Sequence, residues 1–585
     1  MARLKKLNVQ NEKHAFKRVF NHAFVLVKIV LFAVYFGLLL WMFLTPNYLW
    51  LDEARYAWLS VNWSWFRDVW YTFPFGLGFL QSIVLNIVNN QYSVKIVSFL
   101  ASVEVVIVYF KFIERLRNID KEGLFDDVGQ IIMLAMLIFC YPLWRYAVEF
   151  NQYAVDLFVQ ILLIYFASFL FDAGKDVGKY KTKDNRIVQF GVLSAIVVWF
   201  SRPAIYTIAG IYVTYFLLFV YKRLKKFGLK KLQLEKMLKK NFLSFFDVDF
   251  LNMLKSGILV AISWITLYIL RARVVINSGA LSGYWEDAMG FSFVVHNITK
   301  IVQEPFASTL HLASLWWLFF GAVILGLMFL HKNRLTWLGL TLTLPSIITL
   351  FSTALGRFPW KGRVLNFLTL HYVLLAGFGL VFLGQILQVI VKNLLDNKNV
   401  GRSRKKTSSN HLLNVCILNI CKILPYILFV GVFSGYLWNT IFVQVYANNW
   451  GNGGFGQIAK EYGHEIFDNS SIKWILMWGQ YEYDFYGKCN KSLDENKCKN
   501  VLFFPYHKRG GYINPEEFAQ IVKTQALTHT KDSKKLELWL ISTHTNKTRV
   551  EKMKKLCKIL ASSDNITLEK QIIIRDAYAC KLRFE

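Results

Sequence analysis

Long runs of apolar residues recur along the first three quarters of this 585-residue sequence, and they limit its folds more than any other feature. A bilayer core about 30 Å thick is crossed by about 20 apolar residues in an α-helix. The runs are far longer than the tilted strands of an outer-membrane barrel need. Because 55% of the residues are hydrophobic, a soluble enzyme is excluded as well. The chain is predicted to be an α-helical polytopic membrane protein.

The apolar runs predict about eleven transmembrane helices. They are expected at residues 23–45, 96–112, 128–144, 154–171, 188–201, 204–221, 253–270, 312–330, 335–354, 364–390 and 412–438. Ser201, Arg202 and Pro203 interrupt the fifth and sixth runs, where two short spans joined by a turn compete with one kinked helix. This choice decides the orientation of every later span.

The distribution of charge favours the turn. Lys and Arg number 68 against 38 Asp and Glu, a formal net charge of +30. With about eleven spans, roughly thirty basic residues fall on one side of the membrane and about ten in the opposite loops, which marks the first side as cytoplasmic. The basic clusters lie at residues 3–18, 115–121, 175–186, 222–240, 332–334 and 392–406. The charge then serves topology, and no nucleic-acid partner is expected.

Three regions follow from this topology. Residues 1–22 are expected to be cytoplasmic, residues 23–439 to form the transmembrane module, and residues 440–585 to form an extracytoplasmic domain. The tail is predicted to be a small α/β domain that follows a flexible hinge at 451–456. Its strand-like stretches are 473–478, 501–505 and 536–542, followed by a helix at 549–560 and a last segment at 571–584.

Four of the seven cysteines lie in the tail. An even number of thiols in an oxidising compartment predicts disulfides, and four cysteines allow three pairings. Closure of short loops favours Cys489 with Cys498 and Cys557 with Cys580. No spacing of Cys and His supports a structural zinc site.

The sequence contains neither a phosphate-binding G-x-x-x-x-G-K loop nor a strand-anchored G-x-G-x-x-G. Chemical energy must therefore come with the substrate. The long first outer loop, residues 46–95, is rich in aromatic residues, which predicts helices lying in the membrane interface. Asp52 and Glu53 form an acidic pair there and are candidate catalytic residues. The alternative is that they cap an interfacial helix and pair with Arg55.

Two further clusters are expected on the same outer side. Glu149, Tyr153 and Asp156 are spaced to share one helical face at the entrance of the fourth span. Arg357, Lys361 and Arg363 lie in the turn before the tenth span, against the prevailing bias of charge. Cations in that position favour an anionic ligand such as a phosphate, with anchoring to lipid headgroups as the alternative.

The outer loop 271–311 adds Tyr284, Trp285 and His296 as candidate contacts for a sugar or an acceptor. Its acids Glu286 and Asp287 are equally consistent with solvated side chains. No cofactor is certain, although a divalent metal ion bound by Asp52, Glu53 or His296 remains an open alternative. A lone His371 in the tenth span is expected to be a hydrogen-bonded residue of the bundle.

Three patches together resemble one family. They are the acidic pair in a long first outer loop, the E-x-x-x-Y-x-x-D stretch entering the fourth span, and the aromatic-Pro-x-x-Gly-Arg turn before a late span. In this order and sidedness they resemble the GT-C superfamily of polyprenyl-phosphate-sugar-dependent glycosyltransferases. The nearest members are bacterial relatives of the aminoarabinose transferase and the protein O-mannosyltransferases. The resemblance covers most of residues 20–380.

This resemblance implies a GT-C-like fold in a bacterial cytoplasmic membrane and an inverting sugar transfer on its outer face. It implies that Asp52 is the base, that Glu53 is its neighbour and that Arg363 faces the donor phosphate. The chain departs from the family pattern after Glu149, where Phe150 and Asn151 replace a residue that is commonly basic.

The chemistry agrees with this interpretation, because no pool of nucleotide sugars exists outside the cytoplasm. A transferase there needs a polyprenyl-phosphate sugar as donor, and a glycan, lipid or protein hydroxyl as acceptor. A flippase for lipid-linked sugars or a small-solute transporter is the first alternative, although no internal repeat is evident. An assembly protein whose tail binds a partner is the second.

Overall fold

The computed structural model describes most of the helical part of the chain and much of the tail. The described ranges are 2–44, 51–63, 73–88, 92–119, 126–172, 185–226, 248–272, 286–310, 316–400, 454–466, 472–476, 501–504, 536–542, 547–562, 565–574 and 577–584, with a few single residues between them. The chain divides into two compact units, which we describe separately. The first comprises Met1–Phe43, Thr72–Leu77 and Ile96–Ile441, and the second Leu44–Tyr71, Gly78–Lys95 and Phe442–Glu585.

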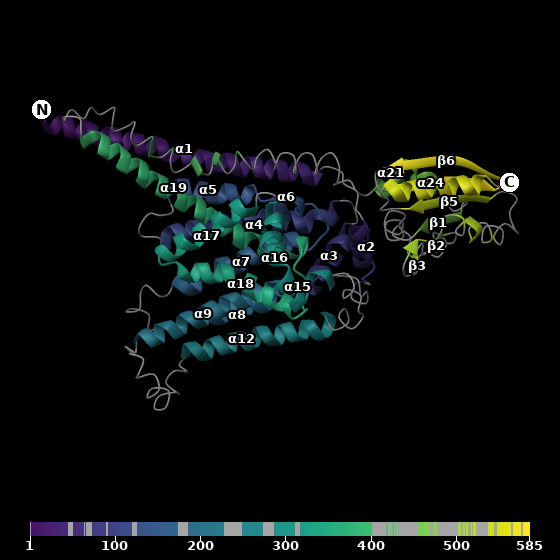
Figure 1. Ribbon diagram of the computed structural model, residues 1–585, viewed down its shortest axis with the longest axis horizontal. Helices are drawn as coiled ribbons and strands as arrows, with labels where there is room; N and C mark the ends of the chain where they lie inside the picture. Colours follow the sequence, from purple (N-terminus) through teal and green to yellow (C-terminus); the bar gives the residue numbers. More distant parts are fainter. Residues whose placement is uncertain are drawn as a thin grey trace. The chain divides into compact units, whose positions relative to one another are not determined.

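The first unit is a bundle of helices (Figure 1). Its elements are α1 (Ala2–Leu44), α4 (Ser93–Ile119), α5 (Asp127–Ile138), α6 (Tyr141–Arg145), α7 (Tyr153–Asp172), α8 (Arg186–Val197), α9 (Ala204–Lys226), α12 (Val248–Leu267), η1 (Tyr268–Ala272), η2 (Glu286–Ala288), α15 (Phe291–His296), α16 (Ile298–Leu310), α17 (Trp316–Lys332), α18 (Thr336–Ala354), η3 (Gly362–Leu368) and α19 (Thr369–Val400). Two more helices, α2 (Leu51–Val61) and α3 (Phe75–Ile87), lie in the predicted first outer loop.

The helical composition fits a membrane. Among the described residues, seven helices are long and apolar enough to cross a bilayer, and four shorter apolar helices of 10–17 residues accompany them. The protein is a multi-pass membrane protein. Each of the first ten predicted spans contains a helix, whereas the eleventh, at 412–438, falls mostly outside the described residues. Helix α3 was not predicted as an apolar helix.

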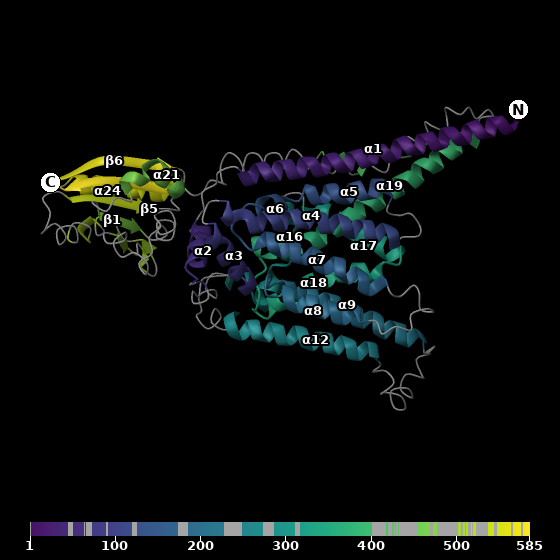
Figure 2. The same ribbon diagram turned by 180° about the vertical axis from the view of Figure 1, so that it is seen from behind.

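The choice at Ser201–Pro203 is resolved by hydrogen bonds to α12. Ser263 donates to the carbonyl of Ala195 at 2.6 Å, near the end of α8. Ser256, two turns earlier in α12, donates to the carbonyl of Ile187 at 2.7 Å and also bonds Tyr212 of α9. Because Tyr212 lies level with the start of α8, α9 runs back alongside α8 and the predicted turn is confirmed. Figures 1 and 2 show these three helices side by side from opposite faces.

The tail in the second unit contains a mixed β-sheet. Its strands are β1 (Ile472–Leu476), β2 (Val501–Phe504), β5 (Leu536–Ser542), β6 (Ile566–Ile574) and β7 (Ala577–Phe584), arranged in the order β2-β1-β5-β7-β6. Strands β1, β2 and β5 are parallel, and β7 is antiparallel to both of its neighbours. A separate pair joins β3 (His507–Lys508) and β4 (Gly511–Tyr512). The three stretches predicted as strands are β1, β2 and β5, with ends shifted by at most two residues.

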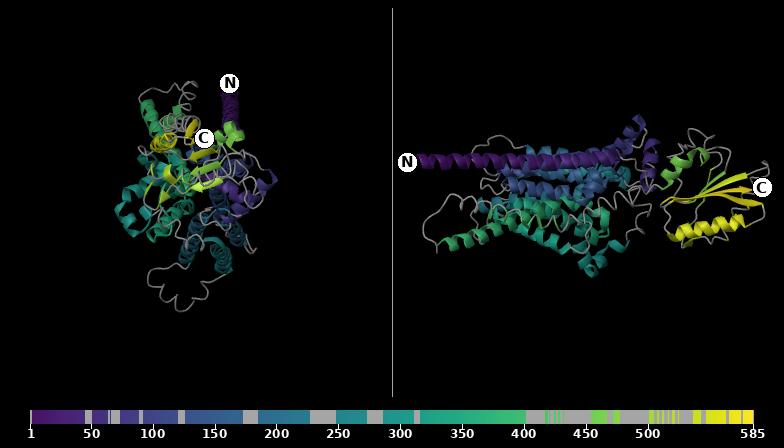
Figure 3. Two further views of the ribbon diagram at one scale, coloured as in Figure 1. Left: turned by 90° about the vertical axis from the view of Figure 1, so that its right-hand side faces the viewer. Right: turned by 90° about the horizontal axis from the view of Figure 1, so that it is seen from above.

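Helices α21 (Gly454–Ile466) and α24 (Lys547–Ala561) cover opposite faces of the sheet, as Figure 3 shows from above. Because side chains alternate along a strand, Leu538 and Leu540 pack with α24. Trp539 and Ile541 instead pack with α21 on the other face. The tail therefore has two apolar cores, one on each side of a single sheet.

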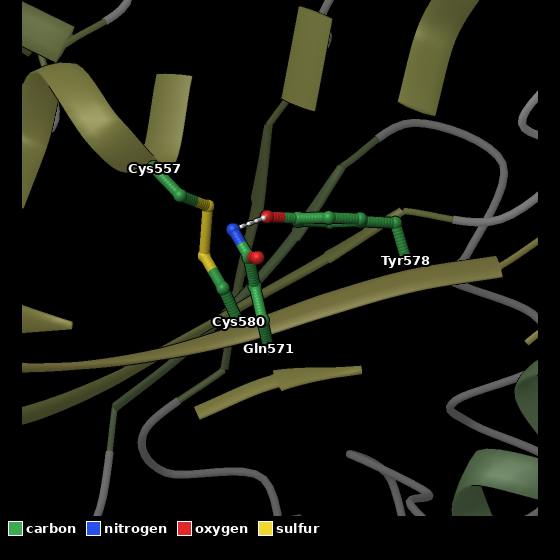
Figure 4. Close-up of a disulfide and its surroundings, with 4 residues drawn as sticks. All are labelled: Cys557, Gln571, Tyr578 and Cys580. Atoms are coloured by element: carbon green, nitrogen blue, oxygen red, sulfur yellow. Dashed lines mark hydrogen bonds between the residues drawn. A yellow bond between two sulfur atoms is a disulfide. The ribbon is translucent and has the colours of Figure 1, made fainter. Parts of the chain in front are cut away.

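A disulfide ties α24 to the sheet. Cys557 and Cys580 are both buried, and their sulfur atoms are joined at 2.06 Å (Figure 4). Beside it, Gln571 Nε2 donates to the hydroxyl of Tyr578 at 2.7 Å. This is one of the two pairs that short-loop closure favoured. The other pair, Cys489 and Cys498, lies outside the described residues.

The predicted hinge at 451–456 is wrong in its second half. Helix α21 starts at Gly454, so residues 454–456 are helical. Ile458, Tyr462 and Ile466 follow at helical spacing and pack on the sheet. Burial of this apolar stripe outweighs the poor helix propensity of the glycines.

We expect the tail to lie outside the cytoplasm and the segment after α9 to lie inside. An alkaline phosphatase reporter fused after Glu585 should be active, and one fused at Lys230, outside the described residues, should be silent. An active reporter at Lys230 would contradict the assigned orientation.

We also expect two disulfides in the purified protein, each stabilising the tail by roughly 2–3 kcal/mol through closure of a short loop. Peptide mass mapping without reduction should recover Cys557 linked to Cys580 and Cys489 linked to Cys498. Alkylation of all four thiols without reductant would reject the pairs and the exported location together.

Candidate active site

The acidic pair lies at the start of α2 in the second unit. Its second member, Glu53, is buried, with 6% of its surface exposed. Lys95, at the start of α4 in the same unit, is 2% exposed and interacts electrostatically with Glu53. Asp52 belongs to α2, but its side chain lies outside the described residues. Glu53 is therefore a buried acid whose charge acts on the buried Lys95, and it is more than a surface helix cap.

Lys95 is a site residue that the sequence interpretation missed. It stands at the last position of the predicted first outer loop and directly precedes the apolar run at 96–112. A buried ammonium group needs a counter-charge, because desolvation of an unpaired ion costs several kcal/mol. A lysine at the mouth of a predicted span was the available signal.

A second cluster, in the first unit, surrounds Glu149. Arg145 at the end of α6 pairs with Glu149, with Nε 3.4 Å from Oε1, and donates to the hydroxyl of Tyr141 at 3.1 Å. The guanidinium also lies over the ring of Tyr146, 5.5 Å from its centroid. The ring of Tyr146 in turn packs against Tyr153, with centroids 4.6 Å apart. Two of the predicted contact residues, Glu149 and Tyr153, thus meet in one cluster.

Tyr146 joins this cluster to Arg363. Burial raises the pKa of the Tyr146 hydroxyl above its usual range, while the positive charges of Arg145 and Arg363 act in the opposite direction. Charges of the second and third sequence patches, around Glu149 and Arg363, thus both act on the Tyr146 hydroxyl.

The segment after Glu149, where the chain departs from the family pattern, is fixed to the bundle. Ser98 of α4 donates its hydroxyl to the Glu149 carbonyl at 2.6 Å. The ring of Phe150 packs against Phe73, with centroids 5.5 Å apart. Asn151 is buried and accepts a bond from the Gln152 amide at 2.7 Å. Phe150 and Asn151 therefore have structural contacts that explain their presence here.

Asp156 lies one turn inside α7 and is 2% exposed. The positive charge of Arg202 interacts with the Asp156 carboxyl. Arg202 follows α8 and also donates to the carbonyl of Phe73 at 3.1 Å. The predicted shared face of Glu149, Tyr153 and Asp156 is only partly realised, because α7 begins at Tyr153 and Glu149 precedes the helix. Arg202 therefore has a role in the site that its position in a turn did not reveal.

The basic turn, residues 356–363, connects α18 to η3. Arg357 is exposed, and Lys361 pairs with Asp287 of η2 at 2.8 Å. This hydrogen bond from Lys361 lowers the pKa of the exposed Asp287 carboxyl. The amide of Gly362 donates to Glu304 of α16 at 2.6 Å. Arg363 is half-buried. Three cations were predicted to bind phosphate. One of them, Lys361, is paired with an acid in the structure.

The remaining predicted residues contribute less. Tyr284 and Trp285 lie outside the described residues. His296 is exposed at the end of α15, with Nδ1 2.8 Å from the carbonyl of Ser292. His371 is buried in α19, with Nε2 3.3 Å from Thr207, in agreement with its prediction as a bundle residue. Within the described residues, no three His, Cys, Asp or Glu side chains are grouped so that they could hold a metal ion.

A comparison with solved structures finds one fold. ArnT from Cupriavidus metallidurans, solved with bound undecaprenyl phosphate, is 10% identical over 95% of this chain and 97% of its own, with a TM-score of 0.51. The apo form of the same protein gives 0.47 at 11% identity over the same shares of each chain. The oligosaccharyltransferase from Archaeoglobus fulgidus gives 0.41 at 12% identity, over 88% of this chain and 68% of its own.

The chain has the GT-C fold. No family model matches the sequence, and a search of curated proteins finds no match either. At 10% identity the similarity concerns the arrangement of the backbone. The similarity therefore shows the fold. The roles of the site residues have to be argued from this chain's own side chains.

The buried pair predicts a mutational coupling. Glu53→Gln should destabilise the protein by about 3 kcal/mol, because it removes a negative charge that favours the buried Lys95 ammonium. Lys95→Met should have a similar effect, and the double variant should recover part of the loss. Thermal unfolding in detergent measures all three, with Asp287→Asn in the exposed pair as a nearly silent control. Strictly additive losses would contradict the pairing.

Proposed function

We propose that this protein is a membrane glycosyltransferase. It transfers a sugar from a polyprenyl-phosphate donor to an acceptor hydroxyl on the outer face of the cytoplasmic membrane, with inversion at C1. The observation that carries the proposal is the similarity over nearly the full length of both chains to ArnT, a protein solved with undecaprenyl phosphate bound. The charged residues at the candidate site supply the chemistry that such a reaction needs.

The leaving group of this reaction is a lipid phosphate, so negative charge develops at the membrane surface as the glycosidic bond breaks. Arg363 is our candidate for the group that stabilises this charge, because a guanidinium can bind phosphate through two hydrogen bonds. Lys361 is a weaker candidate, since it pairs with Asp287. Arg357 is exposed and remains a secondary candidate. In a water-poor site such a contact is worth about 3 kcal/mol.

The acceptor hydroxyl must lose a proton as it attacks C1 of the sugar. We assign Asp52 as the general base. Glu53 is the weaker candidate, because its negative charge favours the buried Lys95 ammonium and protonation would remove that charge. Glu149 is likewise committed to Arg145 at 3.4 Å. Tyr153 and Asp156 are proposed to contact the substrate.

A flippase for lipid-linked sugars would use the same donor but would break no glycosidic bond. The two functions are separated by incubating the purified protein with radiolabelled polyprenyl-phosphate sugars in liposomes. Transfer of label to an acceptor, or its release as free sugar, supports the transferase. Movement of intact labelled donor between leaflets without cleavage would favour the flippase.

Two variants test the assigned roles. Asp52→Asn should lower turnover about 10²–10⁴-fold with nearly unchanged donor binding, because the amide keeps the shape and loses the proton affinity. Arg363→Ala should lower kcat/KM about 100-fold, with a raised KM for the donor. Arg363→Lys should restore the charge without the two-pronged geometry. Initial rates over a range of donor concentrations give both constants.

Arg357→Ala compares a second arginine of the same turn, which is exposed and is our secondary candidate. It should raise the donor KM much less than Arg363→Ala. Near-normal turnover of Asp52→Asn would move the base to Glu53 or Glu149. Full activity of both Asp52→Asn and Arg363→Ala would overturn the proposed mechanism.

A further inference from the structure

Two acidic side chains from different elements contact the basic turn. Asp287 of η2 binds the Lys361 ammonium at 2.8 Å, and both of these side chains are largely exposed, at 66% and 49%. Glu304 of α16 instead accepts a hydrogen bond from the backbone amide of Gly362 at 2.6 Å, in a partly buried position. The first contact joins two flexible side-chain tips, whereas the second fixes the backbone.

The backbone at Gly362 needs such a fixed contact. Gly362 has a φ of +45°, in the left-handed region that glycine tolerates without strain and that glycine also leaves easily. Arg363 is the next residue, so the conformation of Gly362 sets the direction in which the Arg363 side chain leaves the chain. A hydrogen bond from this amide to a carboxylate holds the conformation in place, and bonds to charged acceptors are the stronger ones.

Helix α16 is a firm support for this bond. The indole of Trp360, in the basic turn, donates to the carbonyl of Ile301 at 3.0 Å, one turn before Glu304. Phe306, two residues after Glu304, packs against Phe319 of α17 and Tyr372 of α19, with centroids 5.6 and 5.0 Å apart. Glu304 therefore projects from a helix that is anchored to the bundle on both sides of it.

We propose that Glu304 is a positioning residue that holds the basic turn in the conformation in which Arg363 meets the donor phosphate. This inference rests on the proposed function for its effect on catalysis, but the fixed conformation of the turn can be measured without any substrate. Asp287 binds the Lys361 side chain of the same turn, but this contact does not fix the backbone, so we assign Asp287 no positioning role.

The proposal predicts which kinetic constant changes. Without the bond, the turn samples several conformations, and only a fraction of molecules present Arg363 correctly. The apparent donor affinity falls by that fraction, and saturating donor restores the productive state. We therefore expect Glu304→Ala to raise the donor KM about tenfold or more with little change in kcat. General destabilisation would instead lower the active fraction and thus kcat, with KM unchanged.

Two conservative variants of Glu304 separate the effect of its side-chain length from the effect of its charge. Glu304→Gln keeps an oxygen acceptor at the same distance and should stay within about threefold of the wild-type KM. Glu304→Asp keeps the charge but is one methylene shorter, so it should resemble Glu304→Ala. Asp287→Asn is the matched control, because Asp287 of η2 contacts the same turn only through an exposed side-chain pair, and it should change both constants little. The opposite order of the Gln and Asp variants would overturn a role through the Gly362 amide.

Limited trypsin digestion of the intact protein provides a second readout that needs no donor. Trypsin cleaves after Arg357, Lys361 and Arg363, and cleavage after Lys361 requires the backbone at Gly362 to open. Cleavage there should be faster in Glu304→Ala and Glu304→Asp than in the wild type and Glu304→Gln. If the wild type transfers no sugar, the proposed function fails. The digestion still tests whether Glu304 fixes the backbone at Gly362. Equal cleavage rates in all variants would overturn the inference.

Discussion

The cost of removing charge from water governs the organisation of this protein. A bilayer core cannot solvate an ion, so ionisable groups in the helical part must lie at helix ends, be paired, or both. Three ion pairs near helix ends follow this rule. Lys28 of α1 and Arg117 of α4 share Asp127 at 3.0 and 3.1 Å, and Arg145 pairs with Glu149 at the end of α6. The same requirement explains why Glu53 and Lys95 are buried together.

Buried backbone groups impose a related constraint on the turns of the candidate site. A carbonyl or amide that leaves a helix under apolar cover needs a partner within the protein. Side chains supply these partners: Ser98 binds the carbonyl of Glu149, Arg202 that of Phe73, and Glu304 the amide of Gly362. Each bond joins a turn to a different part of the chain. The groups with catalytic potential are thus positioned by polar contacts that also satisfy the backbone.

The tail follows the rules of a water-soluble domain. Helices α21 and α24 cover opposite faces of its sheet, and the apolar side chains of β5 alternate between the two cores. Charged residues pair across neighbouring strands, where Lys581 and Arg583 lie between Glu537 and Glu569. Hydrogen bonds from Lys581 and Arg583 lower the pKa of the Glu537 carboxyl. A disulfide between α24 and β7 adds a covalent link to a small core.

Local patterns in the sequence determined the elements and the residue types of this protein. Apolar runs predicted the positions of ten helices, Ser201–Pro203 marked the reversal between α8 and α9, and alternation marked β5. Each of these signals lies within a few neighbouring residues. Tertiary structure decided the rest. Helix α21 packs against Trp539, the bond from Gly362 reaches 58 residues back to Glu304, and the charge of Glu53 acts on the buried Lys95. Such contacts join residues far apart in the chain. The sequence alone shows which polar and apolar side chains are present, but not which of them contact one another.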